Sequence, residues 1–261
     1  MRTLHAISFL APNLEPVYRF TMDYLGRQLN CRIELTAGSN YADAYQADLT
    51  FICGLRTPPR RHLAPFEAAA APVLRGERYQ NRPIYFSDVI VRSDSPYQSF
   101  RDLRGCLWAY NEPESQSGYG ITRYWLAQMG ETGGYFGRVV EAGFHQTAIR
   151  MVFDGKVDAA AIDSQVLAVE LRDHPELAAR LRVIDSLGPS TIQPLAASTN
   201  LPAPMKSDIQ AILSEMHTDA AARQWLDRGF IARFVAVQDS DYDDIRAMLA
   251  ACERAAFLTL K

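Results

Sequence analysis

The alternation of strand and helix patterns most constrains how this chain can fold. Apolar runs typical of buried strands occur at 4–10, 32–35 and 48–53, and a helix with one apolar face is predicted over 17–29. Strands separated by helices usually pair in parallel, because each connection has to cross back over the sheet. We therefore predict an α/β fold in which helices cover the faces of a mainly parallel sheet.

The alternation starts again after an extended segment predicted at 85–92. Further strands are predicted at 104–110, 138–141, 157–162 and 182–185, an extended return at 189–198, and helices at 118–129, 147–153, 166–180, 205–228 and 241–256. This layout predicts two α/β lobes, with residues 92–190 inserted between the two parts of the first lobe, 1–91 and 191–261. The alanine run at 68–71 is expected to form a loop or a short helix.

Composition excludes several classes of protein. The chain has 261 residues, of which 48% are hydrophobic and 22% charged, as in globular proteins. The net charge of −3 provides no basic surface for nucleic acid or for an anionic membrane. No apolar run approaches the roughly 18–20 residues that span a bilayer. The four cysteines have no metal-site or disulfide spacing, so we expect neither a metal nor a cofactor.

The segment Pro-Glu-Ser-Gln-Ser-Gly at 113–118 joins a predicted strand to a predicted helix. It places the hydroxyls of Ser115 and Ser117 where the first N–H groups of the helix lack partners. Such a helix end attracts anions, since the free N–H donors and the positive end of the helix dipole coincide. The alternative is ordinary N-capping, for which serine is a preferred residue.

A histidine occupies the corresponding place in the next strand–helix connection. His145 follows the strand at 138–141 and precedes the helix at 147–153. The carboxyl ends of parallel strands meet at one edge of a sheet, so we expect His145 near Ser115 and Ser117. Two hydroxyls and an imidazole can bind an oxyanion. The alternative is a loop histidine bonded to backbone.

Three motifs together indicate a family. Residues 111–118 match a pattern Asp-Pro-x-Ser-Thr-Ser-Gly, 143–149 match Gly-x-His-x-x-x-Ile, and 155–160 match Gly-x-Val-Asp-Ala-Ala. In this order and spacing they resemble the phosphonate/phosphate-type substrate-binding proteins of ABC importers. The resemblance implies a two-lobed type II periplasmic-binding-protein fold with a ligand cleft between the lobes. It also implies a non-enzymatic protein that captures a small oxyanion-bearing ligand, such as a phosphonate or phosphate ester, for an ABC permease; we expect a monomer.

The resemblance also implies which residues bind the ligand. Ser115, Ser117 and His145 would hold the oxyanion, and Gln116 stands where the family has threonine, so that an amide replaces a hydroxyl. Tyr41 and Tyr85 match positions where the family places aromatic rings in the cleft. The full set expected to bind ligand is Tyr41, Tyr85, Ser115, Gln116, Ser117, Gly118, His145, Asp163, Gln165 and Gln193.

Two neutral residues bear on the choice of ligand. Family members that take amino-phosphonates place acids opposite the anion site, whereas Gln165 and Gln193 stand at those positions here. An ammonium buried against amides alone loses its charge compensation. We therefore predict that an aminoalkyl phosphonate is not the preferred ligand. The neighbouring Asp163 would reverse this preference if its carboxylate faced the ligand.

Other interpretations stay open at this point. A ligand sensor in the cytoplasm could have the same fold, and a hydrolase could use Ser117 as nucleophile, His145 as base and Asp158 or Asp163 as orienting acid. No Gly-x-Ser-x-Gly elbow supports the enzyme. The resemblance implies a periplasmic or lipid-anchored protein, whereas a natural start at Met1 implies the cytoplasm. Arginines at 56, 60 and 61 could reach an anion or belong to a solvated loop.

Overall fold

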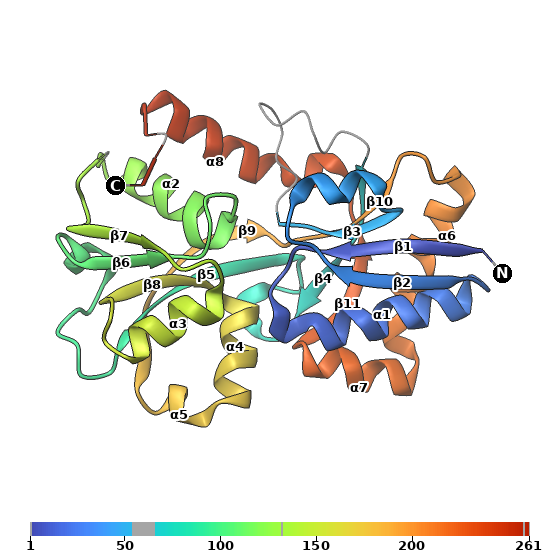
Figure 1. The fold of residues 1–261 in the computed structure, drawn as a ribbon, viewed down its shortest axis with the longest axis horizontal. Helices are drawn as coiled ribbons and strands as arrows, with labels where there is room; N and C mark the ends of the chain where they lie inside the picture. Colours follow the sequence, from blue (N-terminus) through green and yellow to red (C-terminus); the bar gives the residue numbers. More distant parts are fainter. Residues whose placement is uncertain (1, 54–65, 132, 258, 261) are drawn as a thin grey trace. The chain divides into compact units, whose positions relative to one another are not determined.

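The computed structural model describes residues 2–53, 66–131, 133–257 and 259–260, in two compact units. Unit 1 comprises Met1–Ile84 and Thr191–Asp243, and unit 2 comprises Tyr85–Ser190 and Asp244–Lys261. Each unit has one mixed sheet with helices packed on it (Figure 1). The fold is therefore α/β with two sheets and flanking helices, as the strand–helix alternation predicted. The prediction that each sheet is mainly parallel is wrong, because three of the five pairings in the sheet of unit 1 are antiparallel and β5 pairs antiparallel with β8 in unit 2.

The sheet of unit 1 combines a parallel and an antiparallel part. Its strand order is β11-β4-β10-β3-β1-β2, and β1 pairs in parallel with both β2 and β3. The later strand β10 is antiparallel to β3 and β4, and β11 is antiparallel to β4. The strand bounds are β1 Thr3–Ser8, β2 Arg32–Ala37, β3 Leu49–Phe51, β4 Phe66–Leu74, β10 Leu195–Ser198 and β11 Ile231–Ala236.

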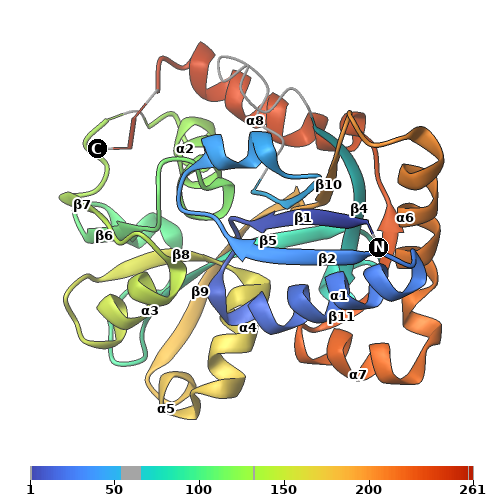
Figure 2. The ribbon, with the colours of Figure 1, turned by 45° about the vertical axis from the view of Figure 1, so that its right-hand side comes forward.

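Helices α1 and α7 of unit 1 lie side by side on one face of this sheet (Figure 2). The single helix expected over 205–228 is divided, because Asp219 accepts hydrogen bonds from Ala221 N and Ala222 N and so caps α7. The helical segments are η1 Pro12–Leu14, α1 Glu15–Gln28, η2 Tyr41–Gln46, η4 Glu77–Tyr79, α6 Ala203–Glu215, η7 Met216–Thr218, α7 Ala220–Arg228 and η8 Asp239–Tyr242.

The alanine run at 68–71 belongs to a central strand, so the expected loop or short helix is wrong. It lies in β4, between β10 and β11, and its four residues are buried. Alanine favours a helix when propensity alone decides. Here hydrogen bonding to a neighbour on each side and burial of the strand outweigh that propensity.

The sheet of unit 2 sets the place of the candidate site. Its order is β7-β6-β8-β5-β9, with β6 parallel to β7 and β8, and β5 antiparallel to β8. The carboxyl ends of β6, β7 and β8 therefore share one edge. The strands are β5 Ile84–Arg92, β6 Leu107–Tyr110, β7 Arg138–Glu141, β8 Ala159–Asp163 and β9 Leu181–Thr191.

The helices of unit 2 lie on both faces of its sheet, α2 on one and α3 and α4 on the other (Figure 1). The helix expected over 166–180 breaks at His174, because the residue before a proline is driven out of the helical region. The segments are η5 Phe100–Leu103, η6 Gln116–Gly120, α2 Ile121–Gln128, α3 His145–Phe153, α4 Ser164–Asp173, α5 Pro175–Ala178 and α8 Asp243–Arg254.

Two segments expected in the first lobe pack with unit 2. Residues 85–91 do so because β5 pairs with β8 from Ser87 to Val91. Residues 244–261 do so because Phe257 and Leu260 are buried in the core that contains Trp108. Leu260 N also donates a 3.0 Å hydrogen bond to the hydroxyl of Tyr119.

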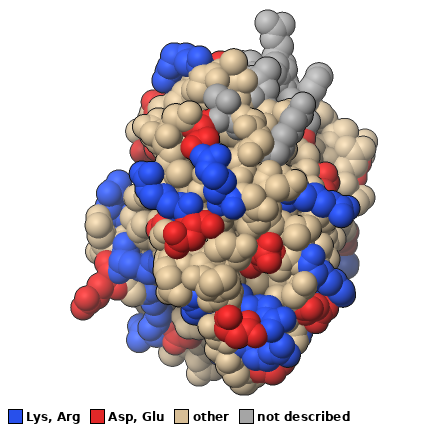
Figure 3. Space-filling view, turned by 90° about the vertical axis from the view of Figure 1, so that its left-hand side faces the viewer, with Lys and Arg blue, Asp and Glu red and all other residues tan. Residues whose placement is uncertain are grey.

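No helix in the described part of the chain is long and apolar enough to cross a bilayer. On the face shown in Figure 3, basic and acidic side chains are interspersed and form no broad field of one sign. That distribution agrees with the small net charge of the sequence.

Candidate functional site

The connection after β6 is a tight turn capped by a serine. Ser115 is the N-cap of η6, and its Oγ accepts a 3.0 Å hydrogen bond from Gly118 N. Its carbonyl oxygen accepts a 2.9 Å bond from Gly120 N. The capping role considered for Ser115 is therefore present. Because capping uses Oγ as an acceptor, the hydroxyl proton can still be donated to another group.

Gly118 allows this turn to close against Asn111. A Cβ at position 118 would collide with Asn111 Oδ1 and would lie 3.2 Å from Asn111 N. Only glycine fits without displacing that side chain. The glycine in the motif therefore has a packing role: it keeps the turn close to the end of β6.

Ser115, Ser117 and His145 form one chain of hydrogen-bonding groups. Ser117 Oγ lies 2.9 Å from His145 Nε2, and Ser115 Oγ lies 3.2 Å from Ser117 Oγ. All three side chains are at least nine-tenths buried. The structure thus brings together the two hydroxyls and the imidazole that the sequence placed at one sheet edge. His145 is the first residue of α3, two residues before the expected helix start.

Burial favours the neutral form of the His145 ring. Burial lowers its pKa from 6.5 to about 4, because the charged imidazolium loses its hydration. Its Nδ1 atom is buried and has no hydrogen-bond partner among the described residues. In particular, no carboxylate of the described residues contacts Nδ1, the place that the orienting acid of a catalytic triad occupies.

Gln116 contacts residues outside this chain. Its Nε2 donates to Ser190 Oγ at 3.4 Å and to Met248 Sδ at 3.3 Å, on β9 and α8. The side chain is almost fully buried and links the turn to the C-terminal helix. Its expected role as an amide donor to the ligand stays a prediction.

The acidic candidates are hydrogen-bonded to backbone. Asp163 is the N-cap of α4, where Oδ1 accepts hydrogen bonds from Gln165 N at 2.8 Å and Val166 N at 3.2 Å. Asp158 Oδ2 accepts a 2.7 Å bond from Leu107 N and so ties β6 to the start of β8. These contacts give each carboxylate a structural role. Gln165, in the first turn of α4, is buried.

The remaining expected residues lie in different parts of the chain. Tyr85 is in β5 of unit 2 and fully buried. Tyr41 begins η2 in unit 1, and Gln193, between β9 and β10, also belongs to unit 1. Their contact with a ligand stays a prediction. Arg56, Arg60 and Arg61 lie outside the described residues.

Phe9 is a candidate that the motif reasoning missed. It directly follows β1, and its ring stacks on Tyr41 with centroids 4.7 Å apart. A Cβ at Gly38 would collide with this ring, so the glycine at the end of β2 makes room for it. An aromatic residue directly after a parallel strand was the available signal, since ligands bind beyond strand carboxyl ends.

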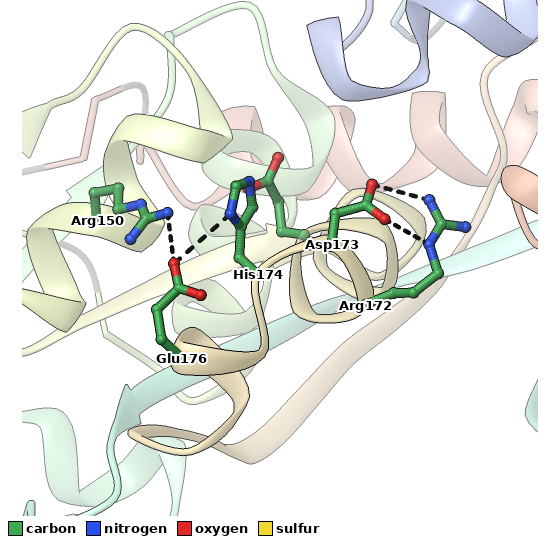
Figure 4. A network of polar contacts seen from close by, with 6 residues as sticks. Arg150, Arg172, Asp173, His174 and Glu176 are labelled. Atoms are coloured by element: carbon green, nitrogen blue, oxygen red, sulfur yellow. Dashed lines mark hydrogen bonds and ion pairs between the residues drawn. The ribbon is translucent and has the colours of Figure 1, made fainter.

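A second polar cluster links α3 to α5 on the surface of unit 2 (Figure 4). Arg150 Nη2 lies 3.1 Å from Glu176 Oε1, and His174 Nδ1 lies 3.6 Å from the same oxygen. The pair Arg172–Asp173 lies to one side of them (Figure 4). Exposed ion pairs of this kind contribute about 0–1 kcal/mol each. Their exposure and pairing indicate a solvated surface network.

A hollow of about 660 Å³ in unit 1 is lined by the end of α1 and by β2. Its walls carry charges of both signs, and two of its arginines pair with nearby acids, Arg19 with Glu15 and Arg32 with Glu34. The hollow shares no residue with the Ser115–Ser117–His145 chain, which belongs to unit 2. We therefore place the candidate site at the serines and the histidine.

Solved structures with a similar fold include binding proteins. One is a binding-protein component of an ABC phosphonate transporter from Pseudomonas aeruginosa, with 18% identity, TM-score 0.84 and coverage of 98% of this chain and 88% of that one. PhnD1 from Prochlorococcus marinus, in complex with methylphosphonate, has 17% identity, TM-score 0.78 and coverage of 97% and 99%. A Xanthomonas citri protein bound to ATP has 16% identity, TM-score 0.67 and coverage of 98% of both chains.

At these identities the solved structures establish the fold alone: that of type II periplasmic binding proteins. The sequence itself establishes the family. Residues 8–242 match the family model described as "ABC transporter, phosphonate, periplasmic substrate-binding protein". That match covers most of the chain, including all three motifs singled out above. This chain therefore belongs to the family of periplasmic substrate-binding proteins of phosphonate ABC transporters.

Proposed function

We propose that this protein binds a small phosphonate or a related oxyanion through Ser115 and Ser117 and delivers it to an ABC permease. The observation that carries the proposal is the hydrogen-bonded chain Ser115–Ser117–His145 at the carboxyl edge of β6 and β7. Hydroxyl groups that lie close together can donate hydrogen bonds to the oxygens of a phosphonyl group and so replace its water. The turn that carries both serines runs directly into α2, whose dipole adds a partial positive charge at that end.

We further propose that the bound ligand leaves unchanged. The family and the similar structures are solute-binding proteins. Ser117 and His145 resemble the first two members of a hydrolase triad, but Asp158 and Asp163 are both bonded to backbone N–H groups. Without an orienting acid, His145 is a poor general base. We expect no hydrolysis of p-nitrophenyl phosphate or p-nitrophenyl acetate above that given by Ser117→Ala.

The proposed ligand class is an alkyl phosphonate without an ammonium group. Gln165 and Gln193 carry no charge, and the Asp163 carboxylate caps α4. An ammonium held by the two amides alone would lose water without gaining a counter-ion. Calorimetry with ethylphosphonate and 2-aminoethylphosphonate separates the two classes at matched chain length. Tighter binding of the amine would refute this specificity.

The binding proposal itself is tested by isothermal titration calorimetry with methylphosphonate and inorganic phosphate. Ser117→Ala is compared with Ser93→Ala, which removes an exposed hydroxyl of the same unit. Loss of a hydrogen bond to a charged ligand costs about 1.5–3 kcal/mol, or roughly ten- to a hundred-fold in affinity. We expect that loss for Ser117→Ala and wild-type affinity for Ser93→Ala. Equal affinity of the two variants would contradict the site.

A further inference from the structure

We propose that His145 is a neutral positioning residue, protonated at Nε2, which donates to Ser117 Oγ and thereby turns the Ser117 hydroxyl proton toward the ligand. This inference rests on the proposed function, since it assumes that Ser117 faces an oxyanion. It assigns to the imidazole a hydrogen-bonding role that needs no positive charge. It also assigns a donor and an acceptor to the hydrogen bonds that link Gly118, Ser115, Ser117 and His145.

The direction follows from what an anion can accept. A fully ionised oxyanion offers only acceptors, so the Ser117 hydroxyl has to donate its proton to the ligand. Ser117 Oγ then has only lone pairs for its neighbours. At 2.9 Å from Oγ, an unprotonated Nε2 would set one lone pair against another. A proton on Nε2 makes the same contact a hydrogen bond.

Ser115 fits the same direction. Its Oγ already accepts from Gly118 N at 3.0 Å, so its own proton is available for donation. Ser117 Oγ, 3.2 Å away, accepts from His145 and does not require the Ser115 proton. The Ser115 proton can lie in the 3.2 Å contact with Ser117 Oγ or turn to the ligand, and in either case the Ser117 proton stays available to the ligand. If Ser117 donated to His145 Nε2 instead, the Ser117 proton would not be available to the ligand.

The environment of Nδ1 selects the neutral ring. Nδ1 is buried and has no partner among the described residues, and buried N–H groups without an acceptor are rare. Both the charged ring and the other neutral tautomer would place a proton there. The neutral ring protonated at Nε2 leaves Nδ1 bare and avoids the unpaired donor. Burial also lowers the pKa of His145, which favours the neutral ring.

The charged groups on the surrounding elements are held in other contacts or lie in the turn. Glu141 at the end of β7 accepts from the Tyr110 hydroxyl, Asp163 at the end of β8 caps α4, and Arg150 on α3 pairs with Glu176. Glu114 lies in the turn itself. Among the described residues, no charged side chain contributes to the lowered pKa of His145, which is due to burial.

The test compares binding of methylphosphonate by wild type, His145→Gln and His145→Ala between about pH 5 and pH 8. Ionisation of the ligand is followed separately by ³¹P NMR and removed from the analysis. Glutamine is uncharged, and its amide nitrogen is as many bonds from Cβ as Nε2 of histidine. His174→Gln, at a partly exposed histidine of the same unit, is the control.

We expect His145→Gln to stay within about five-fold of wild type at every pH, and His145→Ala to bind about ten-fold or more weakly. The His174→Gln control should bind as wild type does. A wild-type affinity that rises as the pH falls through the usual histidine range, and is lost in His145→Gln, would overturn the proposal.

Nitrogen-15 NMR of histidine-labelled protein reads the tautomer directly, without the need for a variant that folds. We expect a neutral ring with the proton on Nε2 at neutral pH, both free and with methylphosphonate. A proton on Nδ1, or a charged ring, would overturn the proposal even if binding is normal. If wild type binds neither methylphosphonate nor phosphate at any pH, the proposed function fails, whereas the tautomer still decides the role of His145.

Discussion

Ser117 Oγ and His145 Nε2 lie 2.9 Å apart, although 28 residues separate them in the chain. The contact arises because β6 and β7 are parallel neighbours, so the connections that follow them start from the same edge of the sheet. One serine and one histidine from successive connections are thereby brought into hydrogen-bond distance. This relationship is the structural basis of the proposed oxyanion site.

Acid should destabilise the protein through His145. Its pKa is about 4 in the folded protein and near 6.5 when unfolded, so the unfolded chain binds more protons between these values. The free energy of unfolding should therefore fall as the pH drops from 6.5 to 4, by about 3 kcal/mol in excess of His145→Gln. Urea titrations at several pH values measure this difference. Parallel pH profiles of the two proteins would show that His145 is not buried as described.

Gly118→Ala should weaken both stability and binding. The added methyl group collides with Asn111 Oδ1, and overpacking of this kind costs about 1–3 kcal/mol. The matched control is Gly133→Ala, where a Cβ would meet no atom within 4 Å. The double variant Gly118→Ala/Asn111→Ala should recover part of the loss, because it removes the colliding amide. Strictly additive effects in chemical denaturation would rule out this explanation.

Phe257→Ala should destabilise unit 2. The ring is 3% exposed and packs in the core with Trp108, and truncation of a buried phenylalanine costs about 3–5 kcal/mol. Phe144→Ala makes the same change at a ring that is 58% exposed, and should cost less than about 0.5 kcal/mol. Urea denaturation of both variants is the measurement. A comparable loss in both would mean that residues 244–261 do not pack as described.

Asp163→Ala should lose the cap of α4. Two backbone N–H groups would lose their acceptor, at a cost of about 0.5–2 kcal/mol. Asp163→Ser should retain most of the stability, since serine is also a good N-cap. The midpoint of thermal unfolding reports the difference. Equal destabilisation by alanine and serine would show that the capping contact is not what the carboxylate contributes.

Much of the fold could be predicted because its local signals agree with its tertiary contacts. The parallel strands β1, β2, β6 and β7 and the helix α1 were all indicated by apolar periodicity. The strand at 68–71 was not indicated by its sequence, because a run of alanines has a helical propensity that only pairing with the neighbouring strands overrides. The position of α8 depends on burial of Phe257 and Leu260 against residues more than a hundred positions earlier, which no local pattern encodes.

Part of the candidate site could likewise be predicted from the sequence, and part of it could not. The proximity of Ser117 and His145 followed from strand order, which the alternation of elements specifies. The orientation of Gln116 did not follow from strand order, because its amide nitrogen donates to Met248 Sδ, 132 residues away. The role of Asp163 also needed the structure, since the start of α4 was expected three residues after it and begins at the next residue. Side-chain direction therefore depended on contacts that sequence position does not reveal.

A crystal structure with methylphosphonate tests the central claim most directly. The account predicts phosphonate oxygens within about 3 Å of Ser115 Oγ and Ser117 Oγ, with the contact between Ser117 and His145 retained. Density for the tetrahedral group at a place that touches neither serine would contradict it.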